Sequence, residues 1–93
     1  MHQAPDVRDT LFEDRANAAL NLAASLVIRR EPEPEEAARL GIQAIAVPEA
    51  QRTETVRKRA TELLRLLHAW PTIPAIKDFS ERLREYQLSA SAA

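Results

Sequence analysis

The chain contains a single glycine, Gly41, among its 93 residues. Tight β-hairpin turns usually need residues at positive φ, a conformation that glycine adopts at the lowest cost. A β-rich fold of this length would therefore need many more glycines. Ala, Leu, Glu and Arg dominate the sequence instead, and these residues lose little side-chain freedom in a helix. The sequence predicts an all-α protein.

The prolines divide the chain into segments with helical periodicity. Proline fixes φ and lacks a backbone N–H, so it is expected in connections or in the first turn of a helix. None of the six prolines falls inside a long periodic segment. The predicted helices span about residues 6–30, 34–47, 49–70 and 74–88. We therefore predict a small helical bundle of about four helices in one domain, residues 1–93, with residues 1–5 and 89–93 frayed.

The second predicted helix contains the glycine, and its end is open to two interpretations. Gly41 either ends a short helix after Leu40 in a left-handed conformation, or lies inside a helix that continues to Val47. The second alternative costs about 1 kcal/mol relative to alanine. We favour the continuous helix, because residues 42–47 would otherwise form a strand without a partner strand.

The two C-terminal helices repeat their apolar residues at spacings of three and four, which is typical of helices that pack along one stripe. The short connection Pro71-Thr72-Ile73 predicts that they form an antiparallel hairpin. Together with the first helix, they supply the predicted core. This core consists of Leu11, Leu22, Leu26, Val56, Leu63, Leu67, Trp70, Phe79 and Leu83.

The first predicted helix is apolar over more than half of its circumference. Leu11, Leu22 and Leu26 lie on the side that we assign to the core, and Asn17 and Asn21 belong to a narrow polar strip. Three short neighbouring helices are not expected to cover so wide an apolar arc. The uncovered edge of the arc is the predicted protein-binding surface. It consists of Phe12, Leu20 and Val27.

Charge and cysteine content narrow the function classes. The formal net charge of −1, from 13 basic and 14 acidic side chains, gives no overall attraction to nucleic acid or anionic membranes. The absence of cysteine excludes disulfides and thiolate chemistry, and it suits the cytoplasm. Residues 1–14 lack the pattern of a secretory signal, and the apolar stretch 16–28 is too short to span a bilayer. We expect a cytoplasmic protein.

Candidate catalytic and metal-binding residues lack the partners that such sites require. His68 lies near a helix end, and a general base needs an orienting partner that the sequence does not supply. A single glycine cannot form a Gly-rich phosphate loop. The acidic residues 31–36 fit the positive end of a helix dipole and lack the spacing of a calcium loop. We expect no enzyme activity, cofactor, metal or small-molecule substrate.

The segment 35–42 is similar to the first helix and turn of a helix-turn-helix motif. In that motif a small residue four positions before a glycine permits close helix crossing, here Ala37 and Gly41. Pro48 would interrupt the second helix of the motif, so the following helix would have to contact DNA. Its candidate nucleic-acid-binding residues are Arg52, Arg57, Lys58 and Arg59. Glu54 and Glu62 balance these cations, which then form an ordinary solvated helix face.

Two function classes remain. The first is a small non-enzymatic helical protein that acts by protein–protein interaction, as an adaptor, an inhibitor or a chaperone-like protein. Its partner is another protein or a second copy of itself. The alternative is a helix-turn-helix-like DNA-binding regulator that uses the basic face of residues 49–70. DNA binding would weaken steeply with salt, whereas an apolar protein interface would not.

Overall fold

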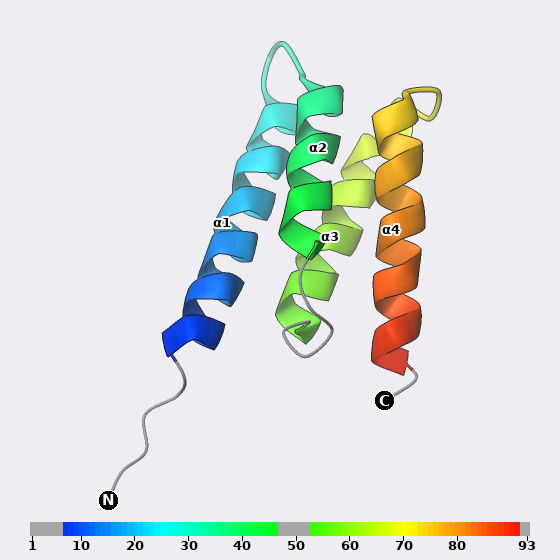
Figure 1. The fold of residues 1–93 in the computed structure, drawn as a ribbon. Helices are drawn as coiled ribbons and strands as arrows, with labels where there is room; N and C mark the ends of the chain where they lie inside the picture. Colours follow the sequence, from blue (N-terminus) through cyan, green and yellow to red (C-terminus); the bar gives the residue numbers. More distant parts are fainter. Residues whose placement is uncertain (1–6, 47–52, 92–93) are drawn as a thin grey trace, which may run out of the picture.

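A computed structural model describes the backbone of residues 7–46 and 53–91, and the side chains of residues 14–46 and 53–88. The described residues form four α-helices and no strand, which confirms the predicted all-α bundle (Figure 1). The helices are α1 (Val7–Ile28), α2 (Pro34–Ile45), α3 (Glu54–Leu66) and α4 (Pro74–Ser91), and the 3-10 turn η2 (Leu67–Ala69) extends α3. The last helix continues past its predicted end at Leu88.

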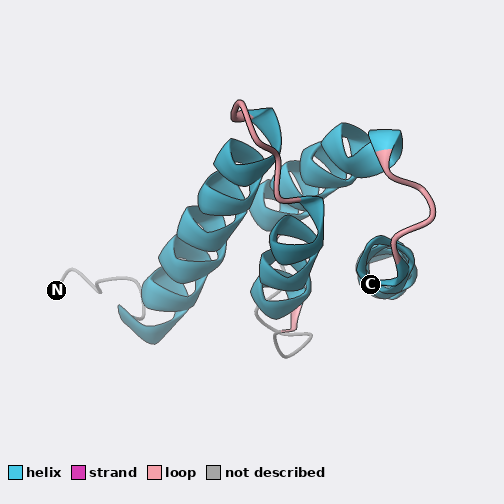
Figure 2. Ribbon diagram, turned by 90° about the horizontal axis from the view of Figure 1, so that it is seen from above, coloured by secondary structure: helices cyan, strands magenta, loops and turns pink. Residues whose placement is uncertain are grey.

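The helix α2 lies in the middle of the bundle. It packs between α1 and α4, and α3 passes behind it and contacts all three of the other helices (Figures 1 and 2). The short connection 70–73 joins η2 to α4, and α3 and α4 run in opposite directions, as predicted. Residues that lie far apart in the sequence therefore share one core.

The core draws buried side chains from every helix. Of the predicted core residues, Val56, Leu63, Leu67, Phe79 and Leu83 are buried. Leu26 and Trp70 are half-buried against the core, and the side chain of Leu11 lies outside the described residues. The prediction for Leu22 is wrong, because this side chain is 53% exposed. The largest fully buried side chains are Leu20, Leu63, Leu67, Phe79, Leu83 and Tyr86.

The helix α1 presents a different side to the core than the sequence predicted. Its buried residues are Ala16, Leu20, Ala23 and Val27. A side-chain contact joins the polar strip of α1 to α3: Arg59 Nη1 donates a hydrogen bond to Asn21 Oδ1 at 2.6 Å. The polar strip of α1 therefore borders α3, and the helix is rotated by about a third of a turn relative to the prediction.

The helix α2 continues without a break through Gly41, so the favoured interpretation of this segment is correct as far as Ile45. Gly41 is buried and has no positive φ. A Cβ atom at this position would lie 2.8 Å from Phe79 Cε1 and 3.0 Å from Leu63 Cδ2. The glycine is therefore required for close packing of α2 against α4 and α3, and not for a turn. The helix ends at Ile45, because Ala46 has φ −81° and ψ 61°, so the predicted continuation to Val47 is wrong.

The start of α3 differs from the prediction. Thr53 has an extended backbone with φ −111° and ψ 157°, and its Oγ1 accepts a hydrogen bond from the Val56 N–H at 3.3 Å. Thr53 is thus the N-cap and α3 begins at Glu54, so the predicted start near residue 49 is wrong. The hydroxyl of Tyr86 donates to the Thr53 carbonyl at 2.8 Å, which ties α4 to this cap.

We expect Thr53→Ala to lower the free energy of unfolding by about 1 kcal/mol, because it removes the side-chain acceptor of the cap. Thr55→Ala is the matched control, since Thr55 is exposed in the first turn of the same helix. Urea denaturation followed by circular dichroism measures both. Equal effects at the two positions would show that the Thr53 side chain does not cap the helix.

Candidate functional site

The side of α1 that faces away from the core carries no charge over several turns. Between Arg15 and Arg29 every residue of α1 is uncharged. Ala18, Leu22 and Ser25 are exposed on this side. The Ser25 hydroxyl donates to the Leu22 carbonyl at 2.7 Å, so its polar group is satisfied within the helix. We call this surface the α1 outer face, and it consists of the exposed Ala18, Leu22 and Ser25 together with Ala19 and Leu26 at its edge, which are half-buried against the core.

The exposed surfaces of the other helices are charged, and their charges are mostly paired. The ion pairs within single helices join Arg39 to Glu35, Arg57 to Glu54, Arg65 to Glu62, and Arg82 to Asp78. Such exposed pairs contribute little to stability, but they keep these surfaces hydrated. Three large apolar side chains are exposed within the described residues: Leu22 and Ile28 on α1, and Leu88 on α4. The α1 outer face is thus an uncharged surface beside helices whose exposed surfaces are largely charged.

Two of the three residues that were predicted to bind a protein lie in the core. Leu20 is 2% exposed and Val27 is 6% exposed, so both belong to the core and the prediction that a partner reaches them is wrong. Their burial follows from the orientation of α1. The side chain of Phe12 lies outside the described residues. The sequence did contain a signal for the exposed, uncharged side of α1, namely the absence of charge from residue 16 to residue 28.

The predicted basic surface of α3 is partly neutralised. Arg57 forms an ion pair with Glu54, and the hydrogen bond from its guanidinium lowers the pKa of that carboxyl below its usual value. Arg59 donates to Asn21 of α1. Lys58 is exposed, and Arg52 lies outside the described residues. The structure therefore brings Arg57, Lys58 and Arg59 onto one helix, but it does not leave them as an unpaired cationic cluster.

The turn that the helix-turn-helix pattern requires is not present at Gly41. Residues 34–45 form one uninterrupted helix, and the glycine lies inside it against Phe79. The spacing between Ala37 and Gly41 thus reflects helix packing in this bundle, and both residues are buried. The observation removes the sequence feature that suggested a DNA-binding motif.

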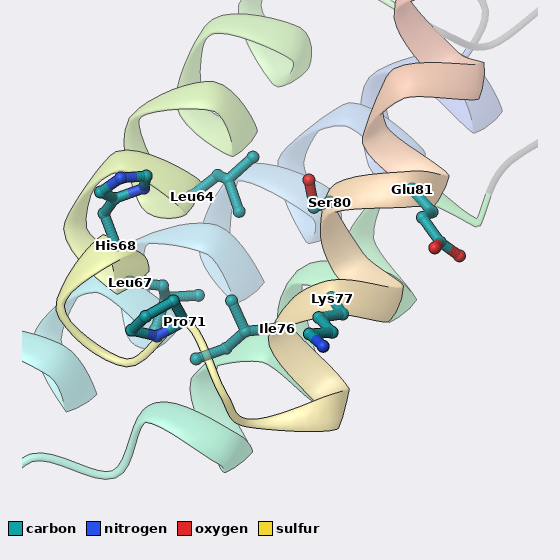
Figure 3. Close-up of a pocket in the computed structure, with 8 residues that line it drawn as sticks. All are labelled: Leu64, Leu67, His68, Pro71, Ile76, Lys77, Ser80 and Glu81. Atoms are coloured by element: carbon teal, nitrogen blue, oxygen red, sulfur yellow. The ribbon is translucent and has the colours of Figure 1, made fainter.

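A groove of about 380 Å³ lies between the end of α3, η2 and α4 (Figure 3). Leu67 and Ile76 form its buried apolar floor, and His68, Ser80 and Glu81 lie around it. Figure 3 shows Glu81 pointing away from His68, and no hydrogen bond joins these three side chains. These three side chains are therefore not linked as the nucleophile, base and orienting acid of a hydrolytic site.

The acidic residues at the start of α2 are held by arginines. Glu33 accepts from Arg29 at 2.7 Å, and Glu35 accepts from Arg39 at 2.6 Å. Within residues 14–46 and 53–88, no group of three His, Asp or Glu side chains is placed to hold a metal ion. None of the helices in the described part of the chain has the length and apolar character needed to cross a bilayer.

Comparison with known proteins adds no assignment: no family model, curated protein sequence or solved structure matches this chain. A functional proposal therefore depends on the surface of the molecule itself.

Proposed function

We propose that this protein is a helical interaction module that binds a protein partner through the α1 outer face. The observation that supports the proposal is a leucine, Leu22, that is 53% exposed at the centre of an uncharged face while the other helices expose charged residues. Interface centres are depleted in charge, and contiguous apolar surface on a soluble domain commonly marks a binding site.

The shape of this surface favours a helix as the element that it binds. Ala18, Ala19 and Ser25 surround Leu22 with small side chains, which allow a second helix to approach closely. A partner helix with one apolar stripe would bury Leu22 and the half-buried Leu26 together. The alternative of DNA binding has lost its main sequence support, and two of the candidate cations of α3, Arg57 and Arg59, contact groups of this protein.

We expect Leu22→Glu to reduce partner capture at least about tenfold, because a charge at an interface centre must be desolvated. The experiment uses the tagged full chain as bait in an extract of the native host, treated with nuclease. Leu88→Glu is the matched control, since Leu88 is 63% exposed and lies on α4 at the other side of α2. Proteins that the wild type and Leu88→Glu retain, but that Leu22→Glu does not, would support the proposal.

Two outcomes would overturn the proposal. One is a set of captured proteins that Leu22→Glu leaves unchanged. The other is capture that disappears on nuclease treatment and weakens steeply with salt, as expected when phosphate contacts release counterions.

A further inference from the structure

We infer that the partner of the α1 outer face is a second copy of this chain, with the two α1 helices packed antiparallel about a two-fold axis at Leu22. The inference rests on the proposed function, because it uses the same surface. The shape of the face favours a second copy as the partner, and the charges at its two ends favour an antiparallel direction of the two α1 helices.

The face is complementary to itself in shape. Leu22 projects from the helix between small residues, with Ala18 and Ala19 on one side along the axis and Ser25 on the other. In an antiparallel pair centred at Leu22, the alanines of one copy meet Ser25 and Leu26 of the other copy. The two Leu22 side chains therefore meet at the axis, and the small side chains around them let the two helices approach closely. A two-fold dimer requires such a self-complementary surface.

The charges at the ends of the face select the antiparallel direction. Asp14 is exposed at the N-terminal end of the face, and Arg29 and Arg30 are exposed at its C-terminal end. The antiparallel arrangement places Asp14 of each copy beside the two arginines of the other. A parallel arrangement would instead place these arginines against the same arginines, and opposed like charges are unfavourable. The antiparallel arrangement also brings Arg29 of one copy near Arg15 of the other. The ion pair of Arg29 with Glu33, at 2.7 Å, reduces the repulsion between these two arginines.

The contact involves one helix face from each copy, so it buries less than the roughly 1,600 Å² of a standard stable interface. We therefore expect a weak dimer with a dissociation constant on the order of 10–100 μM. Sedimentation velocity from about 10 μM to about 1 mM spans this range. The weight-average mass of the wild type should rise with concentration from monomer toward dimer.

Leu22→Glu should keep the protein monomeric over the whole concentration range, because the two-fold axis brings both new carboxylates together. Leu88→Glu makes the same chemical change at an exposed leucine of α4 and should leave the monomer–dimer equilibrium within about twofold of the wild type. Circular dichroism of each variant confirms that the helices are retained. A dimer that resists Leu22→Glu would overturn the inference.

Charge reversal tests the direction of packing. Asp14→Arg alone and the double change Arg29→Glu/Arg30→Glu alone should each weaken the homodimer about three- to tenfold, because each opposes like charges at both ends. An equimolar mixture of the two variants should dimerise about as well as the wild type, since position 14 of each copy again faces opposite charges on the other copy. A parallel pair would also gain from mixing, but neither change alone would weaken it, because its ends already oppose like charges. Weakening of each variant together with recovery in the mixture therefore identifies the antiparallel direction. A mixture that stays monomeric would overturn the antiparallel arrangement.

The two proposals fail in different ways. A wild type that remains monomeric to about 1 mM, while another protein is still captured in a Leu22-dependent manner, would overturn the dimer and leave the interaction module standing. A dimer that forms and that Leu22→Glu does not weaken would overturn the dimer through α1, and the interaction module fails as well only when Leu22→Glu also leaves the captured proteins unchanged.

Discussion

Leu20→Glu is expected to unfold the bundle, whereas Leu22→Glu leaves it folded, although the two leucines lie in the same turn of α1. Residues two positions apart on an α-helix are separated by about 200°, so they face nearly opposite sides. Leu20 is 2% exposed and belongs to the core, and Leu22 is 53% exposed. The same substitution therefore tests two different environments within one helix.

The expected difference between the two variants is large. Removing a buried leucine costs about 2–5 kcal/mol in the free energy of unfolding. A carboxylate at that site would also be buried without a partner, or would have to be protonated, which adds several kcal/mol. Small domains are stable by only about 5–15 kcal/mol, so Leu20→Glu should abolish the cooperative unfolding transition. Surface changes such as Leu22→Glu are expected to stay within about 0.5 kcal/mol.

Thermal denaturation by circular dichroism at low protein concentration measures both variants without a contribution from self-association. Val27→Glu is a second test of the buried face that contains Leu20, because Val27 is 6% exposed and lies about two turns further along α1. A folded Leu20→Glu together with an unfolded Leu22→Glu would mean that α1 has the orientation that the sequence first suggested.

The helices themselves were predictable because proline and periodicity are local signals. Pro34 and Pro74 stand at the first positions of α2 and α4, where a missing N–H group costs nothing. The apolar stripes of α3 and α4 are narrow, so only one side of each helix can face a core. The residues Leu63, Leu67, Phe79 and Leu83 were therefore assigned correctly.

The orientation of α1 was not predictable, because its apolar arc is so wide that two different sides can be buried. Leu22 with Leu26, and Leu20 with Val27, form equally good stripes in the sequence. In the structure Asn21 lies beside α3, where its hydrogen-bond partner Arg59 is 38 residues away in the sequence. Asn17 belongs to the same strip, and its Oδ1 is buried without a hydrogen-bond partner in the described part of the chain. No local signal in the sequence shows that this strip borders α3.

The candidate surface could not be located without this orientation, since the same wide arc contains both the core and the α1 outer face. The sequence identified α1 as the helix with the widest apolar arc, but the edge that it predicted to be exposed is buried. The cap at Thr53 was missed for a different reason. Residues 49–52 contain good helix formers, and only the extended backbone of Thr53 shows where the helix begins.

Gly41→Val is expected to destabilise the protein by about 3 kcal/mol or more, because it inserts a side chain where two helices pack against the backbone of α2. A Cβ atom at this position would lie 2.8 Å from Phe79 Cε1 and 2.9 Å from Phe79 Cζ. Phe79 is 0% exposed and Leu63 is 1% exposed, so neither side chain can move into solvent. The ring and the helix must therefore separate.

Gly41→Ala decides between two opposing effects. Helix propensity alone predicts a gain of about 1 kcal/mol, because glycine loses more backbone freedom than alanine. The overlap with Phe79 predicts a loss of about 1–3 kcal/mol, so we expect a net loss. Gln43→Val controls for the propensity of valine, since Gln43 is exposed on the same helix. It should cost less than about 1 kcal/mol.

A double-mutant cycle with Phe79→Leu identifies the ring as the cause. Replacing Phe79 by leucine removes the ring atoms that would lie closest to the Cβ atom of residue 41. The double variant Gly41→Ala/Phe79→Leu should therefore be more stable than the sum of the single effects by about 0.5–3 kcal/mol. Urea denaturation of the wild type, both single variants and the double variant gives this coupling energy. Additive effects, or a stabilising Gly41→Ala, would show that the close approach of Phe79 to α2 does not require glycine.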